Sequence, residues 1–596
     1  MVIILQVIIV INLIDFEFEL EDIPFIEDGN FRTLKLPVLT EEERFLVDPI
    51  VAPTSGLRIQ ILENIEKEGK KKYLLPNRKL FLFLRTFKAI SEKYKELKEG
   101  KNLKILIVTD NRPSKQILLR YCSQIFAYEG YEIYHQTDQP GESKLSAPYG
   151  AASVALFEDI NLIIVLTASH NDLSWNGVKF YINYPIPLSG DLFKEIAVKA
   201  LKLEEIKFDP NYKPFLIDAE QKNNDYVISL LSRVLEFNKL RGKNIVIWPY
   251  LGKARGIVNL FNRLGANVIL IEEEINPPNP IKVLREDKLR QVMESEDSDI
   301  ALLLDADRDR IALYVKQNGE YYYYIPNEIY SAMHNILANV YHKKIINVRT
   351  IPSDLRGDHT SFINILTGVG YKHLGVILYF LLGIEVDQSK VDTAILYYED
   401  ENKNLIKIDN SALLKQKLLE LIKKNNLLEE EFLIVMWEES GGHTLNILNV
   451  SKDEITGELR FETKFPIIAD KYPVPALVII TELISRGHKI SESIDWSIKG
   501  INRTISAIDE EKVKIMNNFG KNDGKTIKIN NKEYKVNSLS DNNNKVDLYQ
   551  LKSNDSMLYF RPSGTGPEVR FYIFGNRDTH LKEIKAVQDY VKTNYS

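Results

Sequence analysis

The sequence has almost no cysteine: Cys122 is the only one in 596 residues. A single thiol excludes internal disulfides and cysteine-based zinc sites, and it is typical of a reducing compartment. The chain also lacks an excess of positive charge, because 77 Lys and Arg stand against 83 Asp and Glu, for a formal net charge of −6. We therefore expect a cytoplasmic protein that does not bind nucleic acid.

A long hydrophobic run is lacking as well. The nearly unbroken apolar run at residues 1–14 is shorter than the roughly 20 residues that a membrane-spanning helix needs. A secretory signal would place a basic residue before the run and a small-residue cleavage site after it, but the acidic segment 15–19 follows. We interpret the run as a strand or an added extension and expect no membrane association, with a membrane anchor as the alternative.

What the chain does have is the composition of a multidomain globular protein, 44% hydrophobic and 27% charged. Apolar runs rich in β-branched residues alternate with segments that have helical patterning. These runs occupy residues 103–108, 162–166, 244–248, 267–271, 300–304 and 432–437. The alternation predicts βα units and parallel or mixed sheets.

The first polar loop of interest is Thr167-Ala168-Ser169-His170-Asn171, directly after the run 162–166. A buried strand that ends in hydroxyl-bearing residues delivers them to the carboxyl edge of an α/β sheet, where such folds bind ligands. Downstream, Asn176-Gly177-Val178-Lys179 predicts a turn that brings Lys179 back toward Ser169. Upstream, the segment 53–58 predicts a hydroxyl-rich turn ending in Arg58, whose guanidinium suits phosphate. An ordinary polar connection is the alternative.

The second loop carries three carboxylates at alternate positions. Strand 300–304 runs into Asp305-Ala306-Asp307-Arg308-Asp309-Arg310. Oxygen ligands of this kind suit Mg²⁺. A calcium loop of the EF-hand type is excluded, because its sixth position would be Gly rather than Arg310 and its twelfth Glu rather than Lys316. The remaining alternative is a solvated acidic turn.

Two further loops follow strands later in the chain. Strand 432–437 leads into Glu438-Glu439-Ser440-Gly441-Gly442-His443, whose adjacent carboxylates could accept hydrogen bonds from vicinal sugar hydroxyls. Strand 557–560 leads into Arg561-Pro562-Ser563-Gly564-Thr565, where an Arg, hydroxyls and exposed amides could hold a phosphate dianion. The alternatives are a charged helix N-terminus and an ordinary Gly/Pro turn.

Together, in this order, the four loops resemble the α-D-phosphohexomutase family, which includes phosphoglucomutase and phosphomannomutase. The resemblance runs from about residue 54 to the C-terminus. It implies an α/β fold of four domains, three with mixed sheets and a smaller C-terminal α+β domain, around a central cleft. We expect these domains at residues 41–215 (phosphoserine loop), 216–322 (metal loop), 323–485 (sugar-binding loop) and 486–596 (phosphate-binding loop), after an N-terminal extension at 1–40.

The resemblance also implies a role for individual positions. Ser169 matches the phosphoserine, with His170, Lys179 and Arg58 near the transferred phosphoryl group and Lys179 as a general acid/base. The aspartates Asp305, Asp307 and Asp309 would hold Mg²⁺ against that phosphoserine. The positions expected to bind substrate are Arg310, Lys372, Glu439, Ser440, His443, Arg561, Ser563, Gly564 and Thr565.

The expected activity is that of an intramolecular phosphotransferase. It would interconvert a hexose 1-phosphate, glucose in the first instance, with the 6-phosphate through a sugar 1,6-bisphosphate, which also serves as activator. The residues around Ser169 are consistent with this activity, because phosphoryl transfer depends on positioning and charge neutralisation. The Gly-x-Ser-x-Gly elbow of a hydrolase is absent around Ser169. A phosphomannomutase, a phosphopentomutase and a catalytically weak sugar-phosphate-binding relative stay open, as do a monomer and a homodimer.

Two segments depart from the family's usual pattern. Asn171-Asp172 stands where Asn-Pro is usual, and Gly566-Pro567-Glu568 stands where Glu-Pro-Lys is usual. Exchanging a lysine for Glu568 lowers the positive potential near the phosphate loop, although Arg561 and Arg570 remain.

Overall fold

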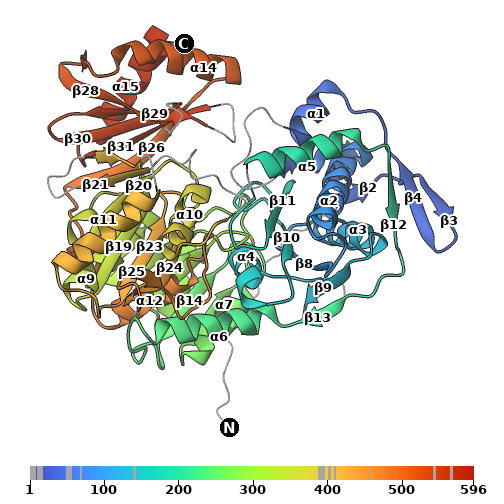
Figure 1. Ribbon diagram of the computed structural model, residues 1–596, viewed down its shortest axis with the longest axis horizontal. Coiled ribbons are helices and arrows are strands. Elements are labelled where there is room, and N and C mark those ends of the chain that lie inside the picture. The colour runs from blue at the N-terminus through green and yellow to red at the C-terminus, as the bar shows by residue number, and fades with distance from the viewer. Residues whose placement is uncertain are drawn as a thin grey trace. The chain divides into compact units, whose positions relative to one another are not determined.

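The computed structural model describes most of the chain. The described residues are 8–9, 18–48, 57–67, 70–137, 142–188, 190–386, 396–399, 405–408, 411–453, 455–540, 545–563 and 568–595. They form two compact units, one made of residues 1–326 and 465–487 and the other of residues 327–464 and 488–596. Figure 1 labels their helices and strands.

The first domain is a mixed sheet in the order β13-β9-β8-β10-β11-β5. Strands β13, β9, β8 and β10 run parallel, whereas β11 is antiparallel to both β10 and β5. The strands are β5 (Leu57–Gln60), β8 (Lys104–Thr109), β9 (Glu132–Gln136), β10 (Leu162–Leu166), β11 (Trp175–Ile182) and β13 (Phe215–Ile217). The helices are α1 (Glu41–Val47), α2 (Asn77–Leu97), α3 (Lys115–Tyr128), α4 (Ala147–Leu156) and α5 (Gly190–Lys202).

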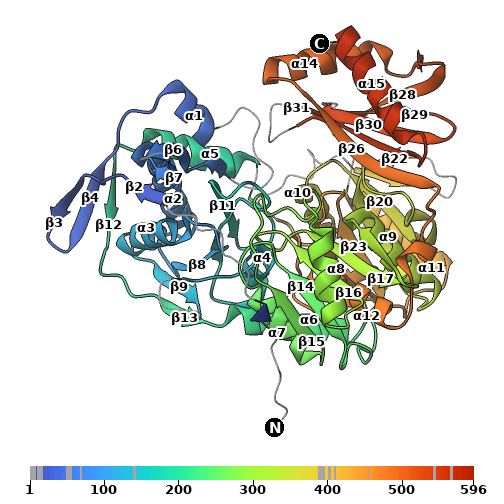
Figure 2. The same ribbon diagram turned by 180° about the vertical axis from the view of Figure 1, so that it is seen from behind.

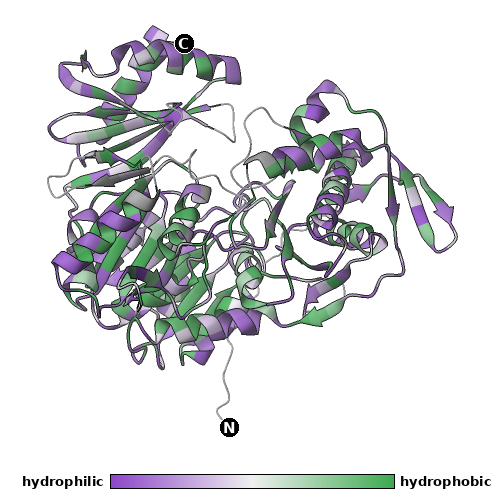
Figure 3. Cartoon of the chain, in the orientation of Figure 1, coloured by the Kyte–Doolittle hydropathy of each residue, from purple (hydrophilic) through white to green (hydrophobic). Residues whose placement is uncertain are grey.

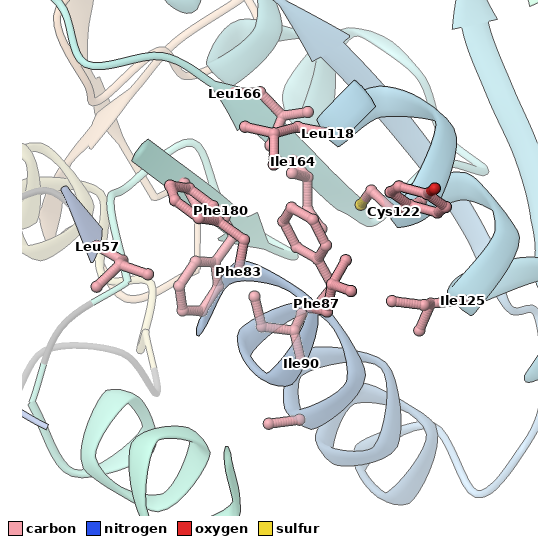
Figure 4. Close-up of a cluster of buried hydrophobic side chains, with 14 of the residues drawn as sticks. Leu57, Phe83, Phe87, Ile90, Leu118, Cys122, Ile125, Ile164, Leu166 and Phe180 are labelled. Atoms are coloured by element: carbon pink, nitrogen blue, oxygen red, sulfur yellow. The ribbon is translucent and has the colours of Figure 1, made fainter. Parts of the chain in front are cut away.

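The core of this domain explains why β10 is uniformly apolar. All five residues of β10 are buried, because helices cover the sheet and no side chain of this strand faces water. Figure 4 shows the side chains of Phe83 and Phe87 on α2 and Cys122 on α3 gathered with Ile164 and Phe180 of the sheet. The expected strands at 103–108 and 162–166 are confirmed within one residue.

Two small sheets are added to this domain from the N-terminal segment. One pairs β2 (Phe18–Leu20) with β7 (Lys70–Leu75) and β7 with β6 (Glu63–Lys67). The other joins β3 (Phe25–Asp28), β4 (Phe31–Lys35) and β12 (Glu205–Phe208), and Figures 1 and 2 show it as a ribbon standing away from the main sheet. The residues that follow the apolar N-terminal run are therefore part of the folded unit.

The second domain repeats the topology of the first. Its sheet has the order β1-β15-β14-β16-β17-β18, with parallel pairing up to β16 and antiparallel pairing beyond it. The strands are β1 (Ile8–Ile9), β14 (Asn244–Trp248), β15 (Asn267–Ile271), β16 (Ile300–Leu304), β17 (Ile311–Gln317) and β18 (Glu320–Tyr324). The helices are α6 (Ala219–Leu231), α7 (Arg255–Arg263) and α8 (Glu286–Ser295). The three expected strands at 244–248, 267–271 and 300–304 are confirmed residue for residue.

Helix α12 (Val474–Ser485) packs against α6, although it lies far along the chain. The buried carboxylate of Glu482 accepts hydrogen bonds from the backbone N–H groups of Lys239 and Leu240. Residues 465–487 are thus tied to the first unit. Of the apolar N-terminal run, only Ile8 and Ile9 are described, and they pair in parallel with Leu270 and Ile271.

The second unit contains two sheets. The first has the order β22-β21-β20-β19-β23-β24-β25, with β20, β19 and β23 parallel. Its elements are α9 (Pro326–Asn339), β19 (Lys344–Thr350), η1 (Asp358–Thr360), β20 (Ile363–Thr367), α10 (Tyr371–Leu382), β21 (Leu396–Glu399), β22 (Leu405–Lys407), α11 (Ser411–Lys424), β23 (Phe432–Trp437), β24 (His443–Lys452) and β25 (Leu459–Glu462). Figure 3 shows its central strands as largely hydrophobic.

The last sheet is antiparallel, in the order β26-β31-β30-β29-β28-β27. Its elements are α13 (Ile490–Ser493), β26 (Ile498–Ser506), α14 (Asp509–Phe519), η3 (Gly520–Asn522), β27 (Thr526–Ile529), β28 (Lys532–Ser540), β29 (Val546–Lys552), β30 (Ser556–Pro562), β31 (Glu568–Asn576) and α15 (His580–Tyr595). The expected class is confirmed: three mixed α/β sheets precede a smaller α+β domain. The expected domain boundaries stay predictions.

None of the helices in the described part of the chain has both the length and the apolar composition that a bilayer crossing requires.

Candidate functional site

The serine loop connects β10 to its antiparallel neighbour β11. Ser169 lies three residues after β10, is fully buried and has a left-handed backbone with φ of +53°. Its hydroxyl donates to Asp305 Oδ2 at 3.0 Å and lies 3.4 Å from Asp309 Oδ1. His170 Nδ1 lies 3.4 Å from the same hydroxyl. The loop therefore presents one hydroxyl directly to the carboxylates of the next domain.

Lys179 reaches this site from a strand. The prediction of a turn at 176–179 is wrong, because these residues lie within β11 and Lys179 pairs in register with Val165. Gly177 is needed there, since a Cβ atom would come within 2.6 Å of the Thr167 carbonyl oxygen. Arg58 lies opposite Gly177 on β5, while the rest of its predicted turn, 53–56, is outside the described residues. Two cations are thus supplied by adjacent strands.

The three aspartates of the metal loop converge as expected. One oxygen from each of Asp305, Asp307 and Asp309 lies within 4.8 Å of the others, and all three side chains are buried. Lys179 Nζ donates to Asp307 Oδ2 at 2.9 Å and to Asp309 Oδ2 at 3.2 Å. Asp307 Oδ1 is buried and has no hydrogen-bond partner among the described residues. A buried set of carboxylates with a spare oxygen is chemically suited to a hard cation.

Burial and mutual charge set the protonation of this cluster. Burial, together with the Asp307 and Asp309 carboxylates, raises the pKa of Asp305 well above its ordinary value. Burial alone would also raise the pKa of Asp309, but the ammonium groups of Lys179 and Lys471 hold it well below its ordinary value. Burial would lower the pKa of Lys179, yet the two facing carboxylates outweigh it and raise that pKa. Lys179 is therefore an ammonium group here, suited to neutralising anionic oxygens.

Arg310, Arg58 and His170 complete the set of ionisable groups at Ser169 and the three aspartates. Arg310 Nε lies 3.6 Å from Asp309 Oδ1 and 3.9 Å from Asp305 Oδ2. Burial lowers the pKa of Arg58, although Asp307 and Asp309 oppose this shift. Burial, with added repulsion from Arg310 and Arg58, also lowers the pKa of His170 well below its ordinary value. His170 is therefore a neutral ring beside the serine hydroxyl at pH 7.

In the second unit, the loop between β23 and β24 holds the predicted sugar-binding residues. Glu439 Oε2 accepts a hydrogen bond from Thr350 Oγ1 at 3.4 Å, and Ser440 Oγ donates to Glu438 Oε1. Burial and the neighbouring Glu438 raise the pKa of Glu439. Lys372 is the second residue of α10, and its side chain lies outside the described part of the structure.

His443 lies apart from the loop surface. It is the first residue of β24, is fully buried, and its Nε2 lies 3.1 Å from Nε2 of His334 on α9. The Tyr330 ring packs against it with centroids 4.5 Å apart. This environment is that of a core residue beneath the loop, so the contacts of His443 give no support to its predicted place beside the sugar.

The phosphate loop follows β30 in the same unit. Arg561 Nη2 donates to Asp547 Oδ1 at 3.1 Å, while Arg561 Nε is buried without a hydrogen-bond partner among the described residues. The backbone N–H of Ser563 donates to the Glu568 carbonyl at 2.9 Å and closes the base of the loop. Arg570 Nε donates to Glu568 Oε1 at 2.8 Å. Gly564 and Thr565 lie outside the described residues.

Comparison with known families bears directly on the serine loop. Residues 79–207 match the model of phosphoglucomutase/phosphomannomutase, alpha/beta/alpha domain I. This segment holds Ser169 and Lys179. This segment is therefore similar to the first domain of phosphoglucomutases and phosphomannomutases. The predicted resemblance is thereby confirmed.

Curated proteins match this chain over part of their own length. The phosphoglucosamine mutase of Neisseria meningitidis serogroup A is 29% identical over 164 residues, which are 27% of this chain and 36% of that protein. The phosphoglucosamine mutase of Helicobacter pylori strain Shi470 is 26% identical over 227 residues, 36% of this chain and 48% of that protein. The chain thus spans about a third to a half of these relatives.

Solved structures agree on the fold over nearly the whole chain. The Paramecium phosphoprotein pp63/parafusin, a phosphoglucomutase, has a TM-score of 0.58 at 14% identity, covering 95% of this chain and 96% of that one. A phosphoglucomutase/phosphomannomutase family protein from Burkholderia thailandensis has a TM-score of 0.54 at 12% identity, covering 91% and 98%. At these identities the likeness shows the fold alone.

One departure from the family pattern has a structural explanation. The Asp172 carboxylate, where proline is usual, accepts a hydrogen bond from Asn276 Nδ2 at 2.8 Å and from the backbone N–H of Ser174 at 2.9 Å. Asn276 Oδ1 in turn accepts from the backbone N–H of Leu173 at 3.0 Å. Asp172 therefore links the serine loop to the segment after β15.

The structure adds two groups of residues to the predicted site. Lys471 Nζ lies 3.8 Å from Asp309 Oδ2, and its neighbour Asp470 accepts a hydrogen bond from the Tyr181 hydroxyl at 2.7 Å. No local pattern identifies Lys471, because its partner is 162 positions away in the sequence. Arg112 could have been found from its position in Asp110-Asn111-Arg112 at the end of β8.

Arg112 holds the serine loop from beneath. Its fully buried guanidinium donates to the carbonyl oxygens of the loop and to one carboxylate. The acceptors are the carbonyls of Ser169, Asn171 (2.9 Å), Asp172 (2.8 Å) and Trp175 (3.0 Å) and Oδ2 of Asp110 (3.0 Å). Asp110 Oδ2 also accepts from the Thr167 hydroxyl at 2.7 Å. One side chain thus fixes the backbone on both sides of Ser169.

We expect Arg112→Met to loosen this loop. Breaking a buried ion pair and leaving its partners unsatisfied costs roughly 3–5 kcal/mol. Backbone amides of residues 167–177 should therefore exchange with solvent at least about 100-fold faster in hydrogen-exchange mass spectrometry. Arg120→Met, which removes an exposed guanidinium from α3, is the matched control. Unchanged protection of 167–177 in the Arg112 variant would contradict the clamping role.

Proposed function

We propose that the protein is a phosphohexomutase that interconverts a hexose 1-phosphate and the corresponding 6-phosphate, with Ser169 as phosphoryl carrier. The observation that carries the proposal is the Ser169 hydroxyl, buried 3.0 Å from Asp305 and beside three carboxylates and several cations. A serine alone is a weak nucleophile, and phosphoryl transfer places its main demand on positioning and charge neutralisation. The residues around Ser169 supply both.

The proposed exchange moves one phosphoryl group at a time. A sugar hydroxyl oxygen forms a bond to phosphorus as the bond from phosphorus to Ser169 Oγ breaks, and the proton of the sugar hydroxyl is transferred in net to Ser169 Oγ. The resulting 1,6-bisphosphate reorients. Ser169 Oγ then bonds to the phosphorus at its other end, the bond from that phosphorus to the sugar oxygen breaks, and the freed sugar oxygen takes up the serine proton. Lys179 and Arg58, on adjacent strands, would neutralise the phosphoryl oxygens together with Arg310 and Lys471, which lie near Asp309.

Asp305, Asp307 and Asp309 would hold the divalent cation, Mg²⁺ in this proposal. When bound, the ion withdraws negative charge from the transferring phosphoryl group. The fit rests on three buried carboxylates with oxygens within 4.8 Å of one another and on the unpartnered Asp307 Oδ1. Lys179 occupies part of this carboxylate set through its contacts with Asp307 and Asp309.

In the second unit, Glu439 and Ser440 would accept hydrogen bonds from the sugar, and Arg561 with Ser563 would bind the phosphate that does not react. Arg561 Nε, which is buried without a hydrogen-bond partner among the described residues, supports this assignment because a guanidinium is well suited to a phosphate. His443 is left out of the binding set, since its contacts are with α9.

The substrate is proposed to be glucose phosphate or its 2-amino derivative, because the names of relatives include phosphoglucosamine mutase and phosphoglucomutase. A coupled assay should compare the 1-phosphates of glucose, glucosamine and mannose, each with Mg²⁺ and a catalytic amount of its 1,6-bisphosphate. The proposal expects turnover with at least one of them. Absence of turnover with every sugar, by protein that binds them, would contradict the mutase activity.

A second candidate function is binding of sugar phosphates with weak catalysis. It is favoured by one observation: both guanidiniums of the phosphate loop already have carboxylate partners, Arg561 with Asp547 and Arg570 with Glu568. A phosphate dianion must compete with those carboxylates for the arginines.

This competition predicts the effect of Glu568→Gln. Removing the charge releases Arg570 for the phosphate, so we expect KM for the sugar phosphate to fall about threefold at low ionic strength and by less at high salt. KM measured at two salt concentrations tests this. Glu533→Gln, an exposed carboxylate in the same domain, is the matched control and should leave KM unchanged. Equal KM values for the parent and the Glu568 variant at both salt concentrations would show that the pair does not restrict binding.

A further inference from the structure

Arg308 stands between two of the metal-loop aspartates but takes no part in their cluster. Its side chain is buried with 4% exposure, and its backbone is left-handed with φ of +67°. A residue with a Cβ atom is strained in that region, where glycine is favoured. A strained, buried arginine persists only where the surrounding contacts stabilise it.

Among the described residues, the hydrogen bonds of the Arg308 side chain all go to backbone carbonyl oxygens. Its guanidinium donates to Asp305 O at 2.7 Å and to Ala306 O, both within its own loop. It also donates to Leu251 O and, at 3.4 Å, to Pro249 O in the turn after β14. One rigid planar group therefore ties the metal loop to the neighbouring turn of the same sheet.

Few other hydrogen bonds of the loop backbone are found among the described residues. Within the loop they are long, with Arg308 N to Asp305 O at 3.3 Å and Asp305 N to Arg310 O at 3.4 Å, and from outside Ala147 N donates to Asp307 O at 3.0 Å. Ala306 packs in a small cluster with Leu173 of the serine loop and Leu251 of the turn. Arg308 and Ala306 thus anchor the back of the loop, while the three aspartates face Ser169 and Lys179.

We propose that Arg308 is a positioning residue that fixes the spacing of the Asp305, Asp307 and Asp309 carboxylates, so that the cation site is formed before the cation arrives. The inference rests on the metal role proposed above. Outer partners that orient metal ligands typically change metal affinity by 10- to 100-fold when they are removed. A lysine keeps the charge at this position but lacks the planar fork that reaches four carbonyls.

The test uses Mn²⁺ as the probe and the full chain, with free Mn²⁺ measured by electron paramagnetic resonance. Arg308→Gly removes the side chain and also relieves the left-handed strain, so the fold should persist. We expect its Kd for Mn²⁺ to rise about 10- to 100-fold, and that of Arg308→Lys to rise about tenfold. Asn318→Gly, at φ of +56° in the β17–β18 turn, is the matched control for relief of strain and should leave the Kd unchanged.

Two results would overturn the inference or the proposed function on which it rests. If folded Arg308→Gly or Arg308→Lys binds Mn²⁺ as tightly as the parent, Arg308 does not position the ligands. If Arg308→Gly does not fold, Arg308→Lys decides, since its charge is retained. If the parent itself binds no Mn²⁺, the proposed metal site fails, and the inference about Arg308 falls with it.

Discussion

Replacing Ser169 by alanine is expected to lower kcat for sugar-phosphate interconversion by roughly 10⁴-fold or more, because the oxygen that carries the phosphoryl group is gone. The loss should fall on kcat, since Arg561 and Glu439, which are proposed to hold the substrate, are unchanged. Purified parent protein should also carry one phosphoryl group on part of its molecules. Intact mass spectrometry should detect it in the parent and not in the Ser169→Ala variant.

The fold of this variant should be almost unaffected. The Ser169 hydroxyl makes one hydrogen bond of 3.0 Å to Asp305, and losing one such bond costs about 1 kcal/mol. Alanine has the same Cβ atom as serine, so the strain at φ of +53° is unchanged. Ser174→Ala, at a buried position in the same loop, is the matched control and should keep full activity. Substantial turnover by Ser169→Ala would rule out Ser169 as the carrier.

The strands of this protein could be predicted because their patterns are local. The runs 162–166 and 300–304 are apolar over their whole length, and 244–248 is apolar after Asn244; the structure buries these apolar residues within the first unit. A polar loop directly after such a strand is easy to recognise. The convergence of Asp305, Asp307 and Asp309 could likewise be predicted from alternate spacing within five residues.

The wrong prediction of a turn at 176–179 shows that local sequence does not determine this strand. Asn176-Gly177 is typical of a turn, but here Gly177 permits close approach of the Leu57 and Thr167 carbonyl oxygens within a continuous strand. The pairing of β11 with both β10 and β5 outweighs the local turn preference. Such pairing depends on residues far away in the sequence.

The surroundings of His443 and Lys471 also could not be predicted from the local sequence. His443 adjoins a recognised loop motif. It is the first residue of β24 and pairs with Trp437 of β23, and its ring lies against His334 of α9. Lys471 belongs to no recognised motif, but the flanking residues fix its position. Asp470 bonds to the Tyr181 hydroxyl, and the Tyr472 hydroxyl donates to Asn223 Oδ1 at 2.9 Å. Only the tertiary structure reveals that these neighbours bring a lysine near Asp309.

Asp307→Asn is expected to have the second largest effect. The substitution keeps the shape of the side chain but removes the charge from a buried carboxylate whose Oδ1 has no hydrogen-bond partner in the described part of the chain. We expect Mn²⁺ affinity to fall by about 100-fold or more, because a direct ligand is lost rather than an outer partner. Loss of that charge near the transferring phosphoryl group should lower kcat by roughly 10³-fold at saturating substrate.

A rival explanation is that Asp307 serves only to hold Lys179, whose Nζ lies 2.9 Å from its Oδ2. Lys179→Met distinguishes this explanation from a metal-binding role of Asp307, because it removes the ammonium group that Asp307 contacts and leaves all three carboxylates. If Asp307 is a metal ligand, Lys179→Met should bind Mn²⁺ at least as tightly as the parent, since a competing cation is gone, whereas Asp307→Asn should bind it weakly. Asp299→Asn, an exposed carboxylate just before β16, is the control for loss of charge. Equal Mn²⁺ affinities for the parent and Asp307→Asn would remove Asp307 from the metal site, and the acidic loop would then act on Lys179 alone.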